Sequence, residues 1–282
     1  MSLAWITGAN GLVGNYLVQT AARFAPCWSV RALTRKQFDL LDFDAMRREF
    51  RHDAPELVIH CAALSRSVDC QRQPELARKV NIEATAALAE LATEIPFIFF
   101  STDLVFDGRK GNYSESDPAN PLSVYAETKL AAEKIVLANP KHTVVRTSLN
   151  AGTSPAGDRG FNEQLRCAFQ RGETLKLFTD EFRCPIPAET TARTIWELAA
   201  KNADGLYHVA GAERMSRWQI GQLVAARLPQ LHPRIEPALA GSYAGPPRPA
   251  DVSLDCRKAQ GLLSFPLPRF SDWIAAEPEG TF

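Results

Sequence analysis

Short apolar runs alternate with longer amphipathic stretches along the first half of the chain. The apolar runs have the length and composition of buried parallel strands, and they cover residues 3–7, 28–33, 56–60, 97–100 and 142–146. Between them, apolar residues recur at helical spacing, which predicts helices over residues 12–24, 43–51, 74–93 and 125–133. Because strand and helix alternate in this order, the pattern predicts an α/β fold with a Rossmann-type, doubly wound parallel sheet and right-handed crossovers.

The alternation loosens after residue 150. Helical spacing recurs over residues 161–171, 190–201 and 216–227, short strands are expected at 175–178 and 205–209, and prolines and glycines at 229–249 indicate loops. We expect residues 1–150, with parts of 180–210, to form the Rossmann domain. Residues 151–282 are expected to form mainly a small C-terminal α/β lobe that closes over the strand ends and binds the substrate.

Composition and charge exclude several classes of protein. The chain carries 32 basic and 32 acidic side chains, so its net charge of zero leaves no electrostatic footprint for nucleic acid or an anionic membrane. The first residues lack the basic segment of a signal peptide, and no apolar run approaches membrane-spanning length. The cysteines and histidines are scattered without metal-ligand spacing. We therefore expect a cytoplasmic protein with a small-molecule substrate and no metal site, and we leave a homodimer open.

Glycines occupy the turn between the first strand and the first helix. Their spacing is Gly-x-x-Gly-x-x-Gly, at Gly8, Gly11 and Gly14. Such glycines let the main chain approach a pyrophosphate closely, and the helix N-terminus adds its dipole and its free N–H groups. The loop therefore predicts binding of a dinucleotide cofactor, an NAD(P), by residues Gly8, Asn10, Gly11, Leu12, Val13 and Gly14.

The end of the second strand favours NADP(H) over NAD(H). Residues 34–36 read Thr-Arg-Lys and lack the acidic residue that binds the ribose 2′-hydroxyl of NAD, whereas an arginine accommodates a 2′-phosphate. We therefore predict that Arg35 contacts the cofactor. NAD(H) stays open as a second option, because Arg35 equally suits a solvated surface position. Asp39 and Leu40 follow shortly after and are expected near the adenine.

Small or polar residues follow the other strand ends. Cys61, Ala62 and Ala63 leave room for a flat cofactor to pass close to the main chain, and Thr147 ends the fifth strand. Asn81 lies inside a predicted helix, where asparagine is unfavourable unless its side chain bonds a main-chain group or a water. We predict cofactor contacts at these positions, because ligands of doubly wound sheets bind at the carboxyl ends of the strands.

The fourth strand runs into two hydroxyls and a carboxylate, Ser101, Thr102 and Asp103. Tyr125 and Lys129 follow at i, i+4 spacing in a helical pattern, which places them on one face of that helix. An ammonium beside a phenol favours the phenolate, so Tyr125 is a candidate proton donor or acceptor near neutral pH. Thr102 is expected to hydrogen-bond the same substrate oxygen. These residues predict acid–base chemistry on a carbonyl or an alcohol.

The assembled motifs resemble the extended short-chain dehydrogenase/reductase superfamily, and within it the dTDP-4-dehydrorhamnose reductase family. The matching segments are TGANGLVG, CAALSRSVDCQRQPELARKVN, STDLVFDG, YSESDPANPLSVYAETKLAAE, VVRTS, GLYHVAG and RPADVSLD, which begin at residues 7, 61, 101, 113, 144, 205 and 248. They follow the family's order across nearly the whole chain. The STD-x-VFDG and YxxTK blocks are the most specific of them.

The resemblance implies roles for individual residues. Tyr125 would be the general acid that protonates the C4 oxygen of a sugar as hydride arrives from the nicotinamide, and Lys129 would lower the Tyr125 pKa and bind the nicotinamide ribose. Thr102 matches the superfamily's catalytic Ser/Thr. Ser101 would face the cofactor, and Asp103 would orient the substrate.

Arg248 is a candidate ligand for a nucleotide-sugar diphosphate. Its charge and its planar fork suit a diphosphate, and a surface salt bridge is the alternative interpretation. The resemblance places Arg248 in the RPADVSLD segment.

The chain departs from the family at positions expected to line the sugar pocket. Leu104 and Leu149 stand where the family usually has Tyr and Trp, so two aromatic contacts to a sugar are lost. Arg183 falls in a segment that reads DEFRCPIP in place of the usual DQ-x-G-x-PT, and it would meet an anionic group on a different substrate. We therefore expect the reductase chemistry to carry over from the family and the substrate to differ.

The sequence leaves three functions to compare. The first is an NAD(P)H-dependent reductase of a keto group, acting on a nucleotide-activated sugar with Tyr, Lys and Thr as the catalytic set. The second is a non-catalytic NADP-binding regulatory subunit, as in methionine adenosyltransferase, although such a subunit has no need of Tyr and Lys at catalytic spacing. The third is a sugar-nucleotide epimerase or dehydratase of the same superfamily. A dehydratase is disfavoured because Leu104, and not an acidic residue, follows Asp103.

Overall fold

The structure, a computed structural model, describes residues 2–37 and 39–277. Its centre is a six-stranded, fully parallel sheet with the order β2-β1-β3-β4-β5-β10. The strands are β1 (Ser2–Thr7), β2 (Trp28–Leu33), β3 (Leu57–His60), β4 (Phe97–Thr102), β5 (His142–Thr147) and β10 (Gly205–Val209). From β1 the chain moves outward to β2 and then returns to β3 on the other side of β1. The strand order therefore reverses between β1 and β3, and ligands of such sheets bind at this point.

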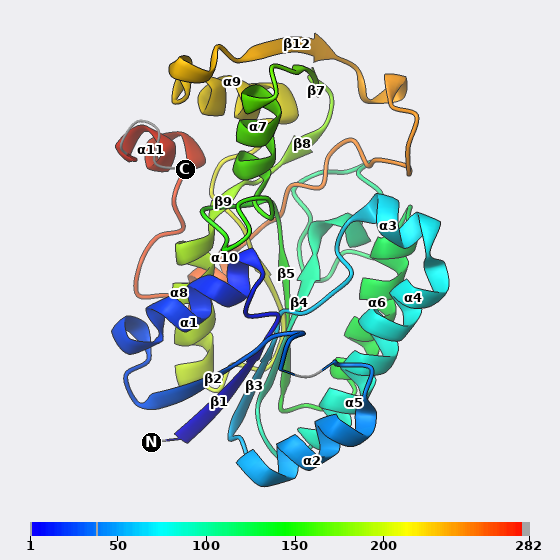
Figure 1. Ribbon diagram of the computed structural model, residues 1–282, viewed down its shortest axis with the longest axis vertical. Helices are drawn as coiled ribbons and strands as arrows, with labels where there is room; N and C mark the ends of the chain where they lie inside the picture. Colours follow the sequence, from blue (N-terminus) through cyan, green and yellow to red (C-terminus); the bar gives the residue numbers. More distant parts are fainter. Residues whose placement is uncertain (1, 38, 278–282) are drawn as a thin grey trace.

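Helices cover both faces of the sheet, which confirms the predicted Rossmann-type doubly wound fold. Figure 1 shows α1 and α8 on one face and α2, α5 and α6 on the other. Their bounds are α1 (Leu12–Phe24), α8 (Ala188–Ala200), α2 (Phe43–Asp53), α5 (Ala84–Leu91) and α6 (Val124–Val136). The strands between these layers are buried on both faces, which explains their continuous apolar runs.

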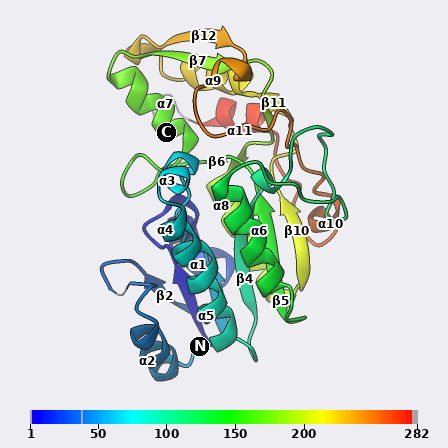
Figure 2. The same ribbon diagram turned by 90° about the vertical axis from the view of Figure 1, so that its right-hand side faces the viewer.

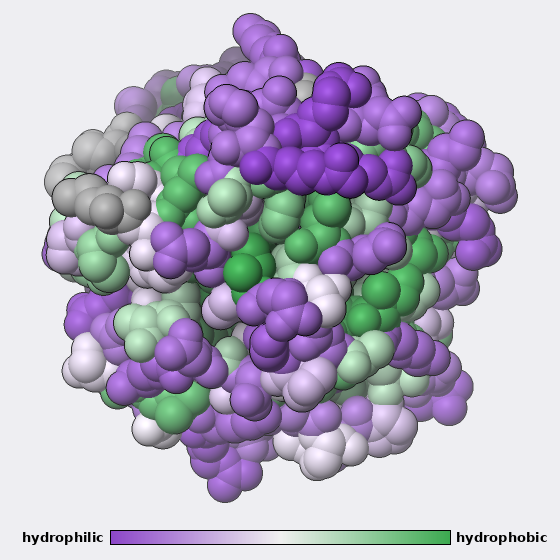
Figure 3. Space-filling model, turned by 90° about the horizontal axis from the view of Figure 1, so that it is seen from below, coloured by the Kyte–Doolittle hydropathy of each residue, from purple (hydrophilic) through white to green (hydrophobic). Residues whose placement is uncertain are grey.

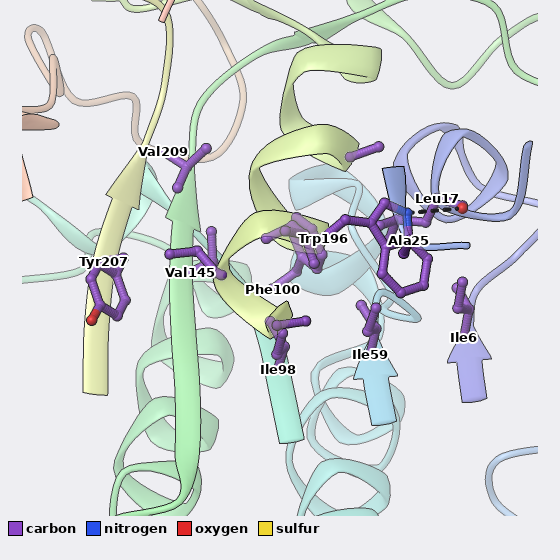
Figure 4. Packing of buried hydrophobic residues seen from close by; sticks show 14 of the residues in the cluster. Ile6, Leu17, Ala25, Ile59, Ile98, Phe100, Val145, Trp196, Tyr207 and Val209 are labelled. Atoms are coloured by element: carbon purple, nitrogen blue, oxygen red, sulfur yellow. Dashed lines mark hydrogen bonds between the residues drawn. The ribbon is translucent and has the colours of Figure 1, made fainter. Parts of the chain in front are cut away.

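The core on the α1–α8 face is built around Trp196 of α8. Figure 4 shows its indole between Leu17 of α1 and Phe100 of β4, and the indole Nε1 donates to the Leu17 carbonyl at 3.2 Å. All three side chains are at least nine-tenths buried. Burying one such side chain contributes about 1.5–3 kcal/mol relative to leaving it exposed. The indole therefore joins α8, which comes late in the sequence, to the first helix of the chain.

The core on the opposite face is aromatic. Phe97 and Phe99 of β4 and Trp5 of β1 are fully buried here, packed with Met46 of α2 and Leu88 of α5. Because side chains alternate along a strand, Phe99 and Ser101 lie on this face, whereas Phe100 lies on the other. The face toward α6 is therefore the one that carries Ser101.

The helix predicted over residues 74–93 is interrupted. It begins as α4 (Pro74–Arg78), widens into a single π-helical turn, η1 (Lys79–Glu83), and continues as α5. A short helix that the pattern did not predict, α3 (Ser67–Arg72), precedes it. The π-helical turn contains Asn81, and such turns occur mostly at functional sites.

A small lobe lies beyond the carboxyl ends of the strands, as Figures 1 and 2 show. Its two-stranded parallel sheet pairs β7 with β12, and its helices share one apolar cluster. The elements are β7 (Thr174–Phe178), β12 (Arg234–Ala238), α7 (Phe161–Gln170), α9 (Arg217–Ala226) and α11 (Phe270–Ala276). The expectation of loops over residues 229–249 was therefore wrong for the five residues of β12.

Short pairings join the lobe to the Rossmann part. β6 pairs with β9, and β8 pairs with β11. The bounds are β6 (Asn150–Ala151), β9 (Ile186–Pro187), β8 (Phe182–Arg183), β11 (Met215–Ser216) and α10 (Arg257–Gln260). An isolated bridge from Tyr113 to Leu254 brings the RPADVSLD segment back to the loop after β4. The lobe is thus anchored at several points around the strand ends.

The end of the molecule away from the lobe has the surface of a water-exposed protein. Figure 3 shows this face mostly hydrophilic, with hydrophobic residues in small groups. Among the described helices, none has both the length and the apolar character that crossing a membrane requires. Within the described residues, no cluster of His, Cys, Asp and Glu side chains could hold a metal ion, and the six cysteines are all free thiols.

Candidate active site

The glycine loop lies where the strand order reverses. Gly8 has φ +68°, and a Cβ there would lie 2.7 Å from the amide nitrogen of Ala62, which follows β3. A Cβ on Gly14 would lie 2.4 Å from the carbonyl oxygen of Gly8, and the N–H of Gly11 donates to that same oxygen at 2.8 Å. The glycines are therefore required by close main-chain contacts. They allow the tight main-chain turn, the cradle, that the site of a pyrophosphate requires between strand and helix.

The first turn of α1 supplies the other half of that cradle. Gly11 caps the helix and contributes no side-chain hydrogen bond, so the first N–H groups of α1 have no side-chain acceptor. Asn10 is exposed, Val13 is half-buried and Leu12 packs into the interior. Leu12 and Val13 are therefore placed to contact a cofactor through their main chain.

The residues predicted to select the cofactor lie on the surface beyond β2. The Arg35 side chain is 79% exposed, and its Nε lies 3.9 Å from a carboxylate oxygen of Asp39. Leu40 is half-buried beside them and packs against the core. An exposed guanidinium can turn toward a 2′-phosphate, and Asp39 is close enough to hold it in place.

A buried polar chain supports the floor of the cofactor cradle. The Thr7 hydroxyl contacts His60 Nδ1 at 2.7 Å and accepts a hydrogen bond from the Ala62 N–H at 3.2 Å. On the other side of the ring, His60 Nε2 contacts the Thr85 hydroxyl at 3.1 Å. Burial lowers the pKa of His60 to about 3, so the imidazole is neutral. This chain orients Cys61, Ala62 and Ala63, which are all half-buried at the end of β3.

Asn81 fixes the segment that follows the end of β3. Its side-chain oxygen accepts from the Leu64 N–H at 2.8 Å, and its Nδ2 donates to the Leu64 carbonyl and to the Thr128 hydroxyl, at 3.1 and 3.0 Å. The Thr128 hydroxyl in turn donates to the carbonyl of Tyr125 at 2.8 Å. Asn81 therefore links the β3 loop to the helix that carries Tyr125, and its expected bond to a main-chain group is present.

Tyr125 lies at the end of β4, as the strand-end argument predicts. The Thr102 hydroxyl, which donates to the Asp103 carboxylate at 3.2 Å, lies beside the phenol and acts to lower the Tyr125 pKa. Burial acts more strongly in the other direction and raises the pKa of Tyr125 far above its usual value, with the charge of Asp103 adding to the effect. The phenol is therefore protonated throughout the neutral range, which is the state that a general acid needs.

Lys129 is buried one helical turn below Tyr125. Only 3% of the residue is exposed, and its Nζ lies 3.9 Å from the centre of the Phe99 ring. Burial lowers the pKa of Lys129 to about 7, although Glu133 opposes the shift. The expectation that Lys129 lowers the Tyr125 pKa stays a prediction.

Ser101 donates its hydroxyl to the core and not toward Tyr125. It bonds the buried carboxylate of Glu133, which also accepts from Arg146 at 2.7 Å. The Ser101 hydroxyl is therefore engaged within the core. The predicted contact of Ser101 with the cofactor would have to be made by its main-chain atoms. Thr147, at the end of β5, accepts a hydrogen bond from the Asn150 side chain at 3.1 Å and is half-buried.

Asp103 and its neighbours form the wall nearest the lobe. Its carboxylate accepts from Ser148 at 2.6 Å and lies 3.4 Å from the Nε of Arg183. Burial raises the pKa of Asp103, while Arg183 and Ser148 oppose the shift. Leu104 and Leu149 are half-buried, and Leu149 packs against the apolar cluster of the lobe.

Arg248 is held by a residue that the sequence argument missed. Glu181 accepts from the Nε and Nη2 of Arg248, at 2.5 and 2.8 Å, and it lies 3.9 Å from the Nε of Arg217. Arg183 and Asp103 lie beside these residues. The region therefore holds three arginines, at positions 183, 217 and 248, and the two buried carboxylates of Asp103 and Glu181. Glu181 is an acidic residue two positions before Arg183. Apart from that neighbourhood, no pattern in the sequence marks Glu181 or Arg217 as part of the site.

A hollow opens between the lobe and α3. Its volume is about 420 Å³, and its walls are Val68, Gln71, Arg72 and the segment 244–247. This volume lies within the range of small-molecule sites.

Among proteins with a doubly wound sheet, a Tyr-x-x-x-Lys helix beside a strand-end threonine is the arrangement of the extended short-chain dehydrogenases/reductases. The structure places the chain in that class. Residues 2–277 match the family described as RmlD substrate binding domain, and the chain belongs to this family. The resemblance that the motifs indicated is thereby confirmed.

Named relatives align along nearly the whole chain. A probable low-salt glycan biosynthesis reductase of Haloferax volcanii is 31% identical, over 97% of this chain and 96% of its own. A dTDP-4-dehydrorhamnose reductase of Sinorhizobium fredii is 30% identical, over 95% and 93% of the two chains. Methionine adenosyltransferase 2 subunit beta of Danio rerio is also 30% identical, over 91% and 84%. The chain is thus similar both to named reductases and to a named subunit of another enzyme.

A solved structure agrees with the fold. The crystal structure of a hypothetical dTDP-4-dehydrorhamnose reductase from Sulfolobus tokodaii has a TM-score of 0.84 and is 28% identical. The match covers 96% of this chain and 98% of the other. The lobe and the Rossmann part therefore both belong to the shared fold.

Proposed function

We propose that the protein is an NADPH-dependent reductase of a keto group on a nucleotide-activated sugar. The observation that carries the proposal is the position of a protonated Tyr125 beside Thr102, with Lys129 one turn below on the same helix. Two relatives are named reductases, and one of them is named for a dTDP-sugar. A regulatory subunit would not require this set of side chains.

The residues present fit a nicotinamide dinucleotide, because the close-packed glycines form a tight turn at the start of α1, whose N-cap residue, Gly11, contributes no side-chain hydrogen bond. When bound, the cofactor supplies the hydride. Tyr125 donates its phenolic proton to the carbonyl oxygen of the substrate, and Thr102 donates a second hydrogen bond that orients that oxygen. Lys129 holds a positive charge below the phenol as the proton leaves. Asn81 keeps the β3 loop and α6 in register, which maintains the distance between the cradle and Tyr125.

Further expectations belong to the same proposal. Arg35 favours NADPH over NADH, which is accepted more weakly, because its guanidinium suits a 2′-phosphate. Arg248 and Arg217 bind the diphosphate of the substrate, and Leu104 and Leu149 line its sugar pocket. The protein acts in the cytoplasm, without nucleic acid, and a homodimer stays a possible assembly.

Replacing Tyr125 tests the proposal directly. The purified protein is incubated with NADPH or NADH and a dTDP-linked 4-keto sugar, and oxidation of the cofactor is followed by its absorbance. We expect Tyr125→Phe to lower kcat by about 10²–10⁴-fold, the usual contribution of a positioned acid, while the Kd for NADPH changes by less than about threefold. Tyr207→Phe, on the edge strand β10, is the matched control and should turn over normally.

Two results would contradict this proposal in different ways. Unchanged turnover in Tyr125→Phe would remove Tyr125 as the acid. Tight NADPH binding by the unmodified protein, with no turnover of any keto sugar, would favour the regulatory role suggested by the methionine adenosyltransferase relative.

A further inference from the structure

Arg183 is buried with donors that nothing in the structure accepts. Only 6% of the residue is exposed, and it stands on β8 at the position where the family usually has glycine. Among residues 2–37 and 39–277, neither its Nε nor its Nη1 has a hydrogen-bond partner. Asp103 lies 3.4 Å from the Nε, which balances charge but leaves these N–H groups unsatisfied.

Unsatisfied donors on a buried cation are unfavourable and rare in folded proteins. A glycine at this position would remove them altogether. A long, charged side chain that enters the interior and leaves its fork unpaired is therefore better explained by a ligand than by packing. The planar fork of arginine matches a carboxylate, which accepts two parallel hydrogen bonds.

The guanidinium lies at the reacting centre and not at the mouth of the site. Its partner Asp103 accepts a hydrogen bond from Thr102 at 3.2 Å, and Arg183, Asp103 and Thr102 all act on the Tyr125 pKa. Ser148, at the end of β5, donates to the same carboxylate of Asp103 at 2.6 Å. A group bound by Arg183 would therefore be attached close to the carbonyl that Tyr125 protonates.

A second pair of arginines lies further out and suits a different anion. The side chains of Arg217 and Arg248 are 23% and 30% exposed, whereas that of Arg183 is 7% exposed. The outer pair surrounds Glu181, which is bonded by Arg248 in bidentate fashion. Three guanidinium groups face two carboxylates, so the region keeps an excess of positive charge. The outer pair can contact a diphosphate while the inner arginine is left for a second anionic group.

We propose that the substrate is a nucleotide-linked keto sugar that carries a carboxylate on its ring, and that Arg183 binds this carboxylate. The proposal rests on the proposed reductase function and specifies its substrate class. Loss of the two aromatic side chains, replaced by Leu104 and Leu149, agrees with a pocket that recognises its sugar by charge. Arg183 is then a specificity-determining residue.

Paired acidic and neutral ligands test the inference. Binding of UDP-glucuronate, UDP-glucose and UDP, and of the corresponding dTDP compounds, is measured by calorimetry on the NADP-loaded protein. We expect the glucuronate to bind at least about tenfold more tightly than the glucose form, as a charge-assisted bidentate contact would give. In Arg183→Gln this preference should fall below about twofold, while NADPH binding is retained as the check on folding.

Arg214→Gln is the matched control. Arg214 precedes β11, the partner strand of β8, and its Nε pairs with Asp251 at 2.7 Å, outside the arginine group described above. It should keep the preference for the acidic sugar. Because the first comparison uses the unmodified protein, the inference stays testable even where Arg183→Gln fails to fold.

Three outcomes would overturn the inference. Equal binding of glucose and glucuronate forms would refute the ring carboxylate and leave the reductase function standing. If Arg183→Gln weakens UDP, UDP-glucose and UDP-glucuronate alike, Arg183 binds the diphosphate and not a carboxylate. If no nucleotide sugar binds while NADPH does, the proposed function fails, and the substrate class fails with it.

Discussion

Burial has opposite consequences for the two titratable residues of α6. It keeps the Tyr125 phenol protonated, as an acid must be, and it destabilises the charged form of Lys129. The Lys129 pKa falls from 10.5 to about 7 in the folded protein. Between these two values the unfolded chain binds the proton more tightly than the folded one, so the amine opposes folding.

Lys129→Met should therefore make the protein more stable and less active. The penalty from Lys129 is fully present below about pH 7, and it disappears as the pH rises toward 10.5. Each unit of pKa shift corresponds to about 1.4 kcal/mol, so the variant should gain a few kcal/mol in unfolding free energy at pH 7. Urea denaturation at pH 6, 7, 8.5 and 10 measures this gain.

The control for this change is Lys134→Met, an exposed position near the end of the same helix. It should alter the unfolding free energy by less than about 0.5 kcal/mol at every pH. Two results would show that burial does not destabilise the charged amine of Lys129. One is a gain in the unfolding free energy of Lys129→Met that does not shrink between pH 7 and 10, and the other is a loss of unfolding free energy at pH 7.

At the scale of single elements, the turn between β1 and α1 is restricted most tightly. Gly8→Ala places a Cβ 2.7 Å from a main-chain nitrogen in a left-handed conformation. We expect a loss of about 2–4 kcal/mol in unfolding free energy, from backbone strain and steric overlap together. NADPH affinity should fall by at least about tenfold, because the cradle must open. Denaturation and a fluorescence titration measure the two effects.

Gly241→Ala provides the comparison for that substitution. Gly241 lies in the lobe with φ outside the left-handed region, and no atom lies within 4 Å of an added Cβ. Both its stability, within about 0.5 kcal/mol, and its NADPH affinity should be unchanged. Should Gly8→Ala behave the same way, the close contact between the loop and Ala62 would not constrain the site.

Local patterns predicted the elements of the main sheet almost to the residue. The strand expected at 28–33 and the helix expected at 12–24 have these bounds in the structure. The π-helical turn was not predicted, because apolar residues keep their helical spacing through it. Asn81 was the one residue that indicated something unusual there. β12 was not predicted, because Pro237 and its neighbours are typical of loops. Proline is nevertheless tolerated on the edge of a sheet, and both strands of a two-stranded sheet are edges.

At the scale of the whole molecule, a buried ion pair joins distant segments of the lobe. Glu181 is 2% exposed and bonds Arg248 across 67 positions of sequence. Glu181→Gln leaves the guanidinium groups of Arg248 and Arg217 without their counter-ion, and we expect a loss of about 3 kcal/mol in unfolding free energy. Glu94→Gln, which breaks an exposed pair with Lys141, should leave the unfolding free energy almost unchanged.

Thermal and urea denaturation of both glutamate variants decides between the two kinds of ion pair. Equal effects of Glu181→Gln and Glu94→Gln would mean that the buried ion pair stabilises the fold no more than the exposed one.

The separation of contacting residues along the chain explains which residues of the site could be predicted from the sequence. Residues at strand ends were predictable, since parallel strands end at one edge of the sheet and bring Gly8, Ala62, Thr102 and Thr147 together. Glu181 and Arg217 could not be predicted. Their contacts join a loop, a helix and a distant segment, and no periodic pattern in the sequence links these three. Arg183 was singled out only because it departs from the family's glycine.

The position of β10 in the sequence also bears on synthesis of the protein. β5 is complete at Thr147, but its outer neighbour in the sheet is encoded at Gly205–Val209, behind most of the lobe. A nascent chain therefore carries β5 as an open edge while roughly sixty further residues emerge, at about 5–20 residues per second. Its inward residues, Val144 and Val145, are fully buried in the finished sheet. An unpaired apolar edge is a template for association with other chains, so the seconds before β10 arrives are when this protein is most exposed to aggregation.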